Sequence, residues 1–164
     1  MVALTRADPA WTDAAQRLIE EVRRTLTDNS AAVEHVGSTA GAGLLAKPIL
    51  DIAARAAPAI SSDAIIERLV AAGWEFRGDS GSSGGLVFVL SVRPDHRVAH
   101  LHVVGADDPQ WGHYLALRDH LRSDPGARAA YEAVKLRLAQ AHPADRAAYT
   151  DGKNEIVRHL RSLS

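Results

Sequence analysis

The sequence predicts an α/β (α+β) fold in which a β-sheet flanked by helices is followed by a helical C-terminal third. Two apolar runs, 32–36 and 49–57, are short and bounded by turn residues, as buried strands usually are. Two more, 86–92 and 98–104, are separated by the turn sequence RPDHR and predict a hairpin. Beyond them, apolar residues recur at helical spacing. At 164 residues the chain has the length of one domain, 1–164.

The first helix is expected to begin at Asp8-Pro9, because aspartate caps a helix and proline suits its first turn. A turn cluster, 28–30, then leads into the first strand. The apolar stripe of this helix consists of Trp11, Ala15, Leu18, Val22 and Leu26.

The middle of the chain is expected to hold one helix, one short strand and a loop. Ser61 or Ser62 caps a helix that ends at Gly73, and 74–76 is the expected strand. The loop 78–85 is almost entirely Gly and Ser, so we expect it to be the most flexible part of the sequence. It has two interpretations, a mobile hairpin tip, which we favour, and a lid over a nucleotide.

The last third predicts three helices, at 110–122, 126–141 and 143–163. Asp108-Pro109 and Asp124-Pro125 repeat the helix start seen near the N-terminus. Two pairs of side chains stand four residues apart and therefore share a helix face, Tyr114 with Arg118 and Tyr149 with Lys153.

Composition excludes several classes of function. The net charge of -1 argues against general nucleic-acid or anionic-membrane binding, and there is no cysteine for disulfides or thiolate chemistry. The N-terminus lacks an apolar signal core, and no apolar run reaches membrane-spanning length. We therefore expect a cytoplasmic protein. Exposed helical faces leave a homodimer open.

The stretch 34–53 carries the clearest chemical pattern. Gly37, Ser38 and Thr39 form a turn after the first strand, and Asp51 follows Ser38 by 51 − 38 = 13 residues on the next strand. Glycine lets the backbone approach a phosphate, hydroxyls and amides can donate to its oxygens, and an aspartate can hold Mg²⁺. The alternative is a tight turn followed by a strand-end aspartate, since so short a motif often occurs by chance.

A second pattern is the histidine pair of the 98–104 strand. Alternation puts His100 and His102 on one face of that strand. They can be metal ligands, or a partly buried, hydrogen-bonded pair, because His-x-His alone is a weak metal signal. Glu34 and His35 point to opposite faces of the first strand, and the sequence does not say which face holds the site.

The run EHVGSTAGAGLLAKPILDI closely resembles the signature of the GrpB family of nucleotidyltransferase-like proteins. The chain departs from that signature at Gly41-Ala42, where the family has Val-Pro, and at Ala53, where the superfamily has a second acid. The matching residues are Glu34, His35, Gly37, Ser38, Thr39, Gly43, Leu44, Ala46, Lys47, Pro48, Ile49, Asp51 and Ile52. The resemblance continues through His100 to Val103, Trp111, Arg118-Asp119, Tyr131-Glu132, Lys135, Tyr149-Thr150 and Lys153.

This resemblance implies a nucleotidyltransferase-like fold, a small mixed β-sheet flanked by helices. It implies a protein that binds a nucleoside triphosphate with a divalent metal and transfers a nucleotidyl group to a small-molecule acceptor, or activates it. The implied phosphate-binding residues are Gly37, Ser38, Thr39, Arg118 and Lys153. The implied catalytic residues are Asp51, His102 and Lys47, with His102 as general base. The implied metal ligands are Asp51, His100 and His102.

The missing second acid leaves the metal and the function open. Mg²⁺ is favoured as the companion of a triphosphate, whereas an Asp51–His100–His102 set would suit Zn²⁺ or Mn²⁺ better and could serve other chemistry, such as hydrolysis. A non-catalytic accessory domain is the main alternative to an enzyme, because Ala53 removes a ligand. An acid retained for function is often unfavourable for stability, so Asp51→Asn is expected to leave the metal-free protein at least as stable.

Overall fold

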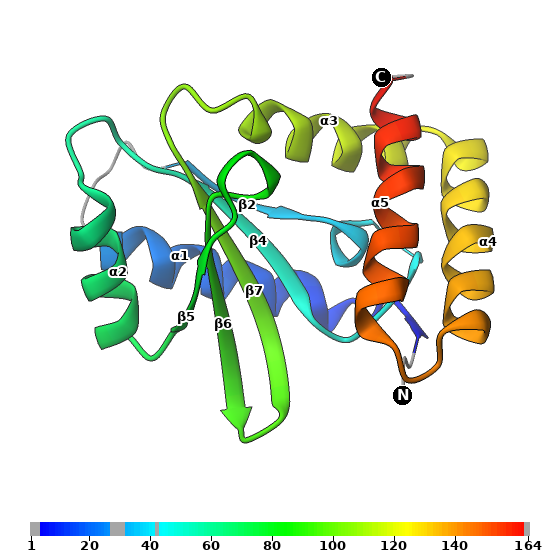
Figure 1. Ribbon diagram of the computed structural model, residues 1–164, viewed down its shortest axis with the longest axis horizontal. Coiled ribbons are helices and arrows are strands. Elements are labelled where there is room, and N and C mark those ends of the chain that lie inside the picture. The colour runs from blue at the N-terminus through cyan, green and yellow to red at the C-terminus, as the bar shows by residue number, and fades with distance from the viewer. Residues whose placement is uncertain (1–3, 27–31, 42, 163–164) are drawn as a thin grey trace.

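The computed structural model describes residues 4–26, 32–41 and 43–162 (Figure 1). The expected turn cluster at 28–30 and Ala42 of the small-residue loop lie outside these residues. None of the helices in the described ranges is both long and apolar enough to cross a membrane.

A five-stranded mixed sheet forms the centre of the fold, which confirms the predicted class. The strands lie in the order β2-β4-β7-β6-β5, and β4 runs parallel to β7 whereas all other neighbours are antiparallel. A separate two-stranded antiparallel sheet joins β1 to β3. The bounds are Thr5–Arg6 for β1, Ala32–Val36 for β2, Leu45–Ala46 for β3, Leu50–Arg55 for β4, Glu75–Asp79 for β5, Leu86–Arg93 for β6 and His96–Val104 for β7.

The sequence prediction was wrong around β5. The strand begins at Glu75 and includes Gly78 and Asp79, which we had assigned to the flexible loop. An irregularity between Phe76 and Gly78 lets glycine take its positive φ of 115° there while the strand keeps pairing with β6. Trp74 precedes the strand and is 2% exposed, because it packs into the core.

Aspartates cap the helices that follow Asp-Pro pairs, as predicted. Carboxylate Oδ1 of Asp8 accepts a hydrogen bond from the amide of Ala10, and Asp108 and Asp124 cap their helices in the same way. The last helix begins later than expected from Pro143, because Asp145 serves as its cap by accepting from the amide of Ala148. The helices are Ala10–Leu26 for α1, Ser62–Ala71 for α2, Gln110–Ser123 for α3, Pro125–Ala141 for α4 and Arg146–Ser162 for α5.

The helices divide between the two faces of the sheet. The main apolar core lies between one face and α1 with α2. On the opposite face, Trp111 of α3 packs against Val36, Ala53 and Val104. Figure 1 shows α4 and α5 side by side at one end of the sheet, where Leu160 packs in a third cluster with residues of α3 and α4.

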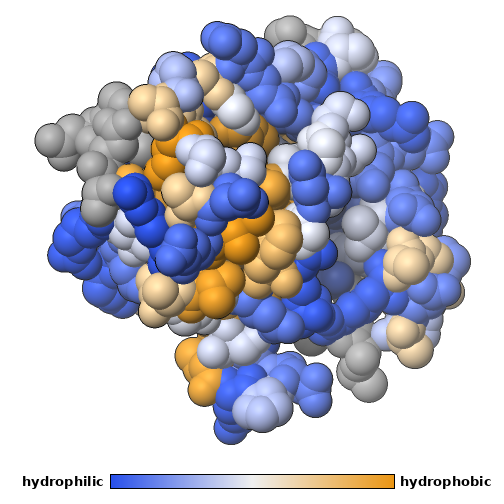
Figure 2. All heavy atoms as spheres, turned by 60° about the vertical axis from the view of Figure 1, so that its left-hand side comes forward, coloured by the Kyte–Doolittle hydropathy of each residue, from blue (hydrophilic) through white to orange (hydrophobic). Residues whose placement is uncertain are grey.

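Figure 2 views the molecule from the side of α2, where apolar side chains reach the surface among hydrophilic ones. Within α2, Val70 is 49% exposed, whereas Ile66 packs partly against the main core. The apolar side chains around α2 therefore belong to the edge of the main core, on the face of the sheet opposite α3.

Strand register settles which face carries the predicted site. Asp51 lies opposite Val36 of β2 and His100 of β7, and Ala53 lies opposite Glu34 and His102. Paired residues point to the same face, so all of these side chains lie on the face that α3 covers. His35 points to the other face.

Candidate active site

The turn after β2 presses directly against Asp51. Gly37 has a φ of +70°, and residues Ser38–Ala40 form a single 3-10 turn behind it. A Cβ atom on Gly37 would lie 2.7 Å from Oδ2 of Asp51. Only glycine fits this conformation and this contact, and the turn and the carboxylate therefore form one site.

Asp51 is held as a carboxylate among cations. Its side chain is 28% exposed, and Nδ1 of His100 lies 3.4 Å from its Oδ1. Burial alone would raise the pKa of Asp51. The hydrogen bond from His100 and the positive charge of Lys153 outweigh burial and lower the pKa below its usual value.

His102 lies next to Ala53 and faces the glycine loop. Its Nδ1 is 3.3 Å from the carbonyl oxygen of Gly84, and its ring centroid is 5.7 Å from that of Tyr114. Burial lowers the pKa of His102, although the charge of Asp51 opposes this, so the ring is neutral at physiological pH. A carbonyl only accepts hydrogen bonds, so Nδ1 carries the proton of the neutral ring and Nε2 is the basic nitrogen.

The glycine loop is more ordered internally than its composition suggested. The amide of Ser80 donates to the carbonyl of Gly85 over 2.8 Å, and the amide of Gly81 donates to Asp79 over 2.8 Å. Gln110 of α3 also donates to the carbonyl of Ser82. The contacts of Gly84 with His102 and of Ser82 with Gln110 therefore place the loop beside His102. Its flexibility remains a prediction.

The donors around Asp51 fit one Mg²⁺ ion that arrives with a nucleotide. Within the described residues, no group of three or more His, Cys, Asp and Glu side chains is placed to hold a metal. Ala53, where a second acid would stand, is 0% exposed and packs against Trp111. Mg²⁺ commonly binds through one carboxylate, waters and substrate phosphates, and Asp51 could supply that carboxylate. The Asp51–His100–His102 centre remains a prediction.

The two hydroxyls of the turn already have partners in the protein. Oγ of Ser38 donates to the hydroxyl of Tyr131 over 3.2 Å, and both residues are buried. Oγ1 of Thr39 lies 2.8 Å from Nε2 of His35. A hydroxyl can turn its proton from one acceptor to another. Because Tyr131 also has a hydrogen bond with Lys153, Tyr131 can donate to Ser38 instead and free the Ser38 proton for a phosphate oxygen.

Two Tyr-x-x-x-Lys pairs, on α4 and α5, supply cations beside the turn. Nζ of Lys135 lies 4.8 Å from the ring centroid of Tyr131, and Nζ of Lys47 lies 4.1 Å from that of Tyr149. Lys153 also belongs to this group of cations, because it has a hydrogen bond with the hydroxyl of Tyr131. Tyr149 and Lys153 were predicted to share a helix face, and Lys47 lies against the ring of Tyr149. Tyr131 and Lys135 were part of the family resemblance but were not assigned to the site, although their spacing in YEAVK is the same as in YTDGK.

The lysines differ in how firmly they hold their charge. The phenol oxygen of Tyr131, and next the carboxylate of Asp51, raise the pKa of Lys153 against the effect of burial. Burial and then the charge of Lys153 lower the pKa of Lys47. Lys153 is therefore a permanent cation beside Asp51, and both side chains remain partly exposed to a ligand.

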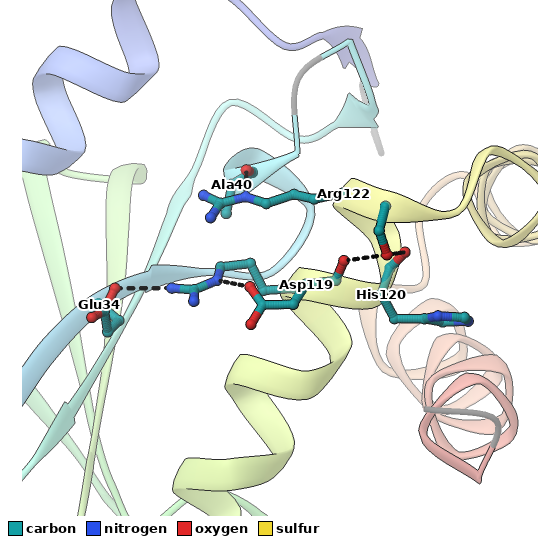
Figure 3. A network of polar contacts seen from close by, with 7 residues as sticks. Glu34, Ala40, Asp119, His120 and Arg122 are labelled. Carbon is teal, nitrogen blue, oxygen red and sulfur yellow. Dashed lines mark hydrogen bonds and ion pairs between the residues drawn. The ribbon is translucent and has the colours of Figure 1, made fainter.

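The structure does not bring Arg118 to the turn as a free cation. Its Nη1 lies 2.9 Å from Glu34, and its Nε lies 2.8 Å from Asp119. Figure 3 shows Glu34 and Asp119 at this contact and Arg122 reaching Ala40. Two carboxylates already balance the charge of Arg118, so contact with a phosphate would require one of these pairs to open. Its assignment as a phosphate ligand remains a prediction.

Burial of His35 predicts a pH-dependent loss of stability. The His35 side chain is 8% exposed, and burial lowers its pKa to about 4, against the opposing charge of Asp51. The unfolded chain, with a histidine pKa near 6.5, therefore binds a proton first as the pH falls. We expect the free energy of unfolding to decrease by about 3 kcal/mol between pH 6.5 and pH 4. His35→Gln should remove that part of the pH dependence in denaturant titrations. An unchanged slope in the variant would contradict the assignment.

The mixed sheet, with a Gly-Ser turn against a strand-borne aspartate, has a nucleotidyltransferase-like fold. The Cid1 poly(U) polymerase bound to MgGTP has the same fold, with a TM-score of 0.58 and 15% identity over 82% of this chain and 44% of that one. The crystal structure of the conserved protein GrpB from Enterococcus faecalis is more similar, with a TM-score of 0.83 and 29% identity over 98% of both chains.

The chain belongs to the GrpB protein family, whose model matches residues 1–162. A UPF0157 protein of Pseudomonas aeruginosa is 36% identical over 94% of this chain, and the match spans 64% of that relative's length. A dephospho-CoA kinase of Mycolicibacterium paratuberculosis is 31% identical over 96% of this chain, which corresponds to 44% of the kinase.

Proposed function

We propose that this chain binds a nucleoside triphosphate with Mg²⁺ at the turn of Gly37, Ser38 and Thr39 and transfers the nucleotidyl group to a small-molecule acceptor. The observation that carries the proposal is the contact of this turn with the Asp51 carboxylate, with Lys47 and Lys153 beside it. Phosphoryl chemistry requires mainly positioning and charge stabilisation, and these residues can provide both. The likeness to a polymerase bound to MgGTP supports the same conclusion.

Each group has a defined task in this proposal. The turn orients the phosphates through its amides and the Ser38 hydroxyl, and Lys47 and Lys153 balance their charge. Mg²⁺ held by Asp51 would neutralise charge on the phosphate oxygens. Nε2 of His102 accepts the proton of the acceptor hydroxyl, the acceptor oxygen forms a bond to the α-phosphorus, and pyrophosphate leaves.

One observation favours a second function, that of a non-catalytic accessory domain. Ala53 stands where the superfamily carries its second acid and is fully buried against Trp111. The match to dephospho-CoA kinases, in which similar sequence makes up less than half of a longer chain, supports a domain that assists a partner. In that case the fold would keep a ligand site without turnover.

A thermal-shift screen separates these functions. Purified protein is heated with ATP, GTP, CTP or UTP, each with Mg²⁺, Mn²⁺, Zn²⁺ or a chelator. A ligand at a hundred times its dissociation constant adds about 2.7 kcal/mol of stability. We expect a shift that needs one nucleotide together with Mg²⁺, and pyrophosphate release when acceptors are added. Binding without any pyrophosphate release would favour the accessory domain. A shift with Zn²⁺ or Mn²⁺ alone would favour the Asp51–His100–His102 centre.

Ser38→Ala tests the role of the turn in the same assay. We expect nucleotide affinity to fall about tenfold, because one charge-assisted hydrogen bond is lost. The protein should remain folded, although the Tyr131 hydroxyl loses a partner. Ser91→Ala, in an exposed part of β6, is the control and should change nothing. Unaltered affinity in the Ser38 variant would remove Ser38 from the site.

A further inference from the structure

We infer that Lys135 is a positioning residue that couples polyphosphate binding to the uptake of one proton. This inference rests on the proposed function, because it requires an anion at the turn of Gly37, Ser38 and Thr39. Lys135 has no task in the transfer step itself. Its location and its neighbours nevertheless connect it to the residues that would bind the phosphates.

Helix α4 holds both backbone groups of Leu45. Carboxylate Oε1 of Glu132 accepts from the amide of Leu45 over 2.7 Å, and Nζ of Lys135 donates to the carbonyl of the same residue. Lys47 follows two residues later. The two α4 side chains therefore fix the short strand β3 and, through it, the point from which Lys47 reaches toward the site.

Lys135 is a buried amine with charged groups on several sides. The residue is 1% exposed. The charges that act on it come from Lys153 of α5, Lys47 after β3, Glu132 of α4 and Asp51 of β4, and the Tyr131 ring lies against it. Two of these charges are positive and two are negative, so the surroundings do not compensate fully for a buried cation.

The protonated and neutral forms of Lys135 are consequently similar in free energy near neutral pH. Burial, followed by the charge of Lys153, lowers the pKa of Lys135 to about 7, while Glu132 and Asp51 oppose the change. The amine can donate to the carbonyl of Leu45 in either protonation state, so its positioning role does not depend on its charge.

A polyphosphate bound between Lys47 and Lys153 would change that balance. Its negative charges offset the two lysines that repel a proton on Lys135, and the protonated amine becomes the favoured form. By linkage, binding then takes up a proton, and affinity falls as the pH rises above about 7. The ligand itself changes the number of exchanged protons in the opposite direction, because a polyphosphate that binds among cations releases protons that it carries.

Isothermal titration calorimetry tests this inference on the full chain. Inorganic pyrophosphate and ATP, each with Mg²⁺, are titrated at pH 7.5 in buffers that differ in ionisation enthalpy, which gives the number of protons exchanged. Lys135→Met reports the protons that the ligand itself releases. We expect the wild type to take up as much as about three quarters of a proton more than this variant, because an amine with a pKa of about 7 is already partly protonated at pH 7.5. Equal proton exchange in the wild type and in Lys135→Met would overturn the inference and leave the proposed function intact. If neither probe binds, the proposed function fails, and this inference fails with it.

Two further variants separate charge from structure. Lys135→Arg keeps a permanent cation, so it should show only the ligand's own proton release, and its affinity should not fall between pH 7 and 8.5. Ser91→Ala, in the exposed part of β6, is the control, and its proton uptake should equal that of the wild type. A purely structural role for Lys135 predicts the same pH profile in the wild type and in the arginine variant, which would contradict the coupling. If Lys135→Met does not fold, Lys135→Arg supplies the same reference for the protons that the ligand releases.

Discussion

Asp51→Asn is expected to abolish metal-dependent nucleotide binding, with a loss of affinity of at least about a hundredfold. The carboxylate is the oxygen donor that lies against the turn, and its charge is the counter-charge for Lys153. An amide of the same size keeps the shape of the site and removes that charge. Calorimetric titration of the wild type and the variant with ATP and Mg²⁺ measures the effect. Full binding by the variant would leave the accessory-domain function as the better explanation.

The same variant is expected to lose stability in the absence of metal, by about 1–3 kcal/mol. The sequence suggested the opposite, since an acid retained for function is often unfavourable. The structure reverses that expectation, because the lowered pKa of Asp51 means that folding favours its ionised form. Asp63→Asn, at an exposed acid of α2, should stay within about 0.5 kcal/mol of the wild type in denaturant titrations.

Gly37→Ala is expected to damage both stability and binding. Alanine at a φ of +70° is strained by about 1 kcal/mol, and its Cβ would lie 2.7 Å from Oδ2 of Asp51. We expect a total loss of about 2–4 kcal/mol and a fall in nucleotide affinity of roughly a hundredfold, since the carboxylate must move.

Gly43→Ala is the matched control for this prediction. Gly43 has a φ of +74°, and a Cβ atom there would meet nothing within 4 Å. The free energy of unfolding of this variant should fall only by the strain of the left-handed conformation, about 1 kcal/mol. The difference between the two variants isolates the contact with Asp51. Equal losses in melting and binding assays would show that the contact is unimportant.

Local signals predicted most of the elements, because each depends on residues close in sequence. Aspartates before α1, α3 and α4 and the serine before α2 cap helices where expected, and the alternation of β7 placed His100 and His102 on one face. The short sheet of β1 with β3 was missed, since Leu45 and Ala46 pair with a segment about forty residues away and carry no strand pattern of their own.

The site could be predicted only in part for the same reason. The residues of the signature lie within one stretch, so Gly37, Ser38 and Asp51 were recognised together. The partners of Ser38 and of Arg118 come from distant elements, Tyr131 and Glu34, and nothing in the local sequence selects them. Alternation along β2 separated Glu34 from His35, but only pairing with β4 revealed that Glu34 shares the face of Asp51.

The docking of α5 on the first third of the chain has a consequence for protein synthesis. Asp51 precedes Lys153 by 153 − 51 = 102 residues, so a ribosome finishes Asp51 long before it makes the cation that balances its charge. A nascent chain without α5 would have the motif but an incomplete charge balance. On the proposed function, a chain translated only as far as α4 would not yet bind nucleotide, because binding requires α5 to place Lys153 beside Tyr131 and Asp51.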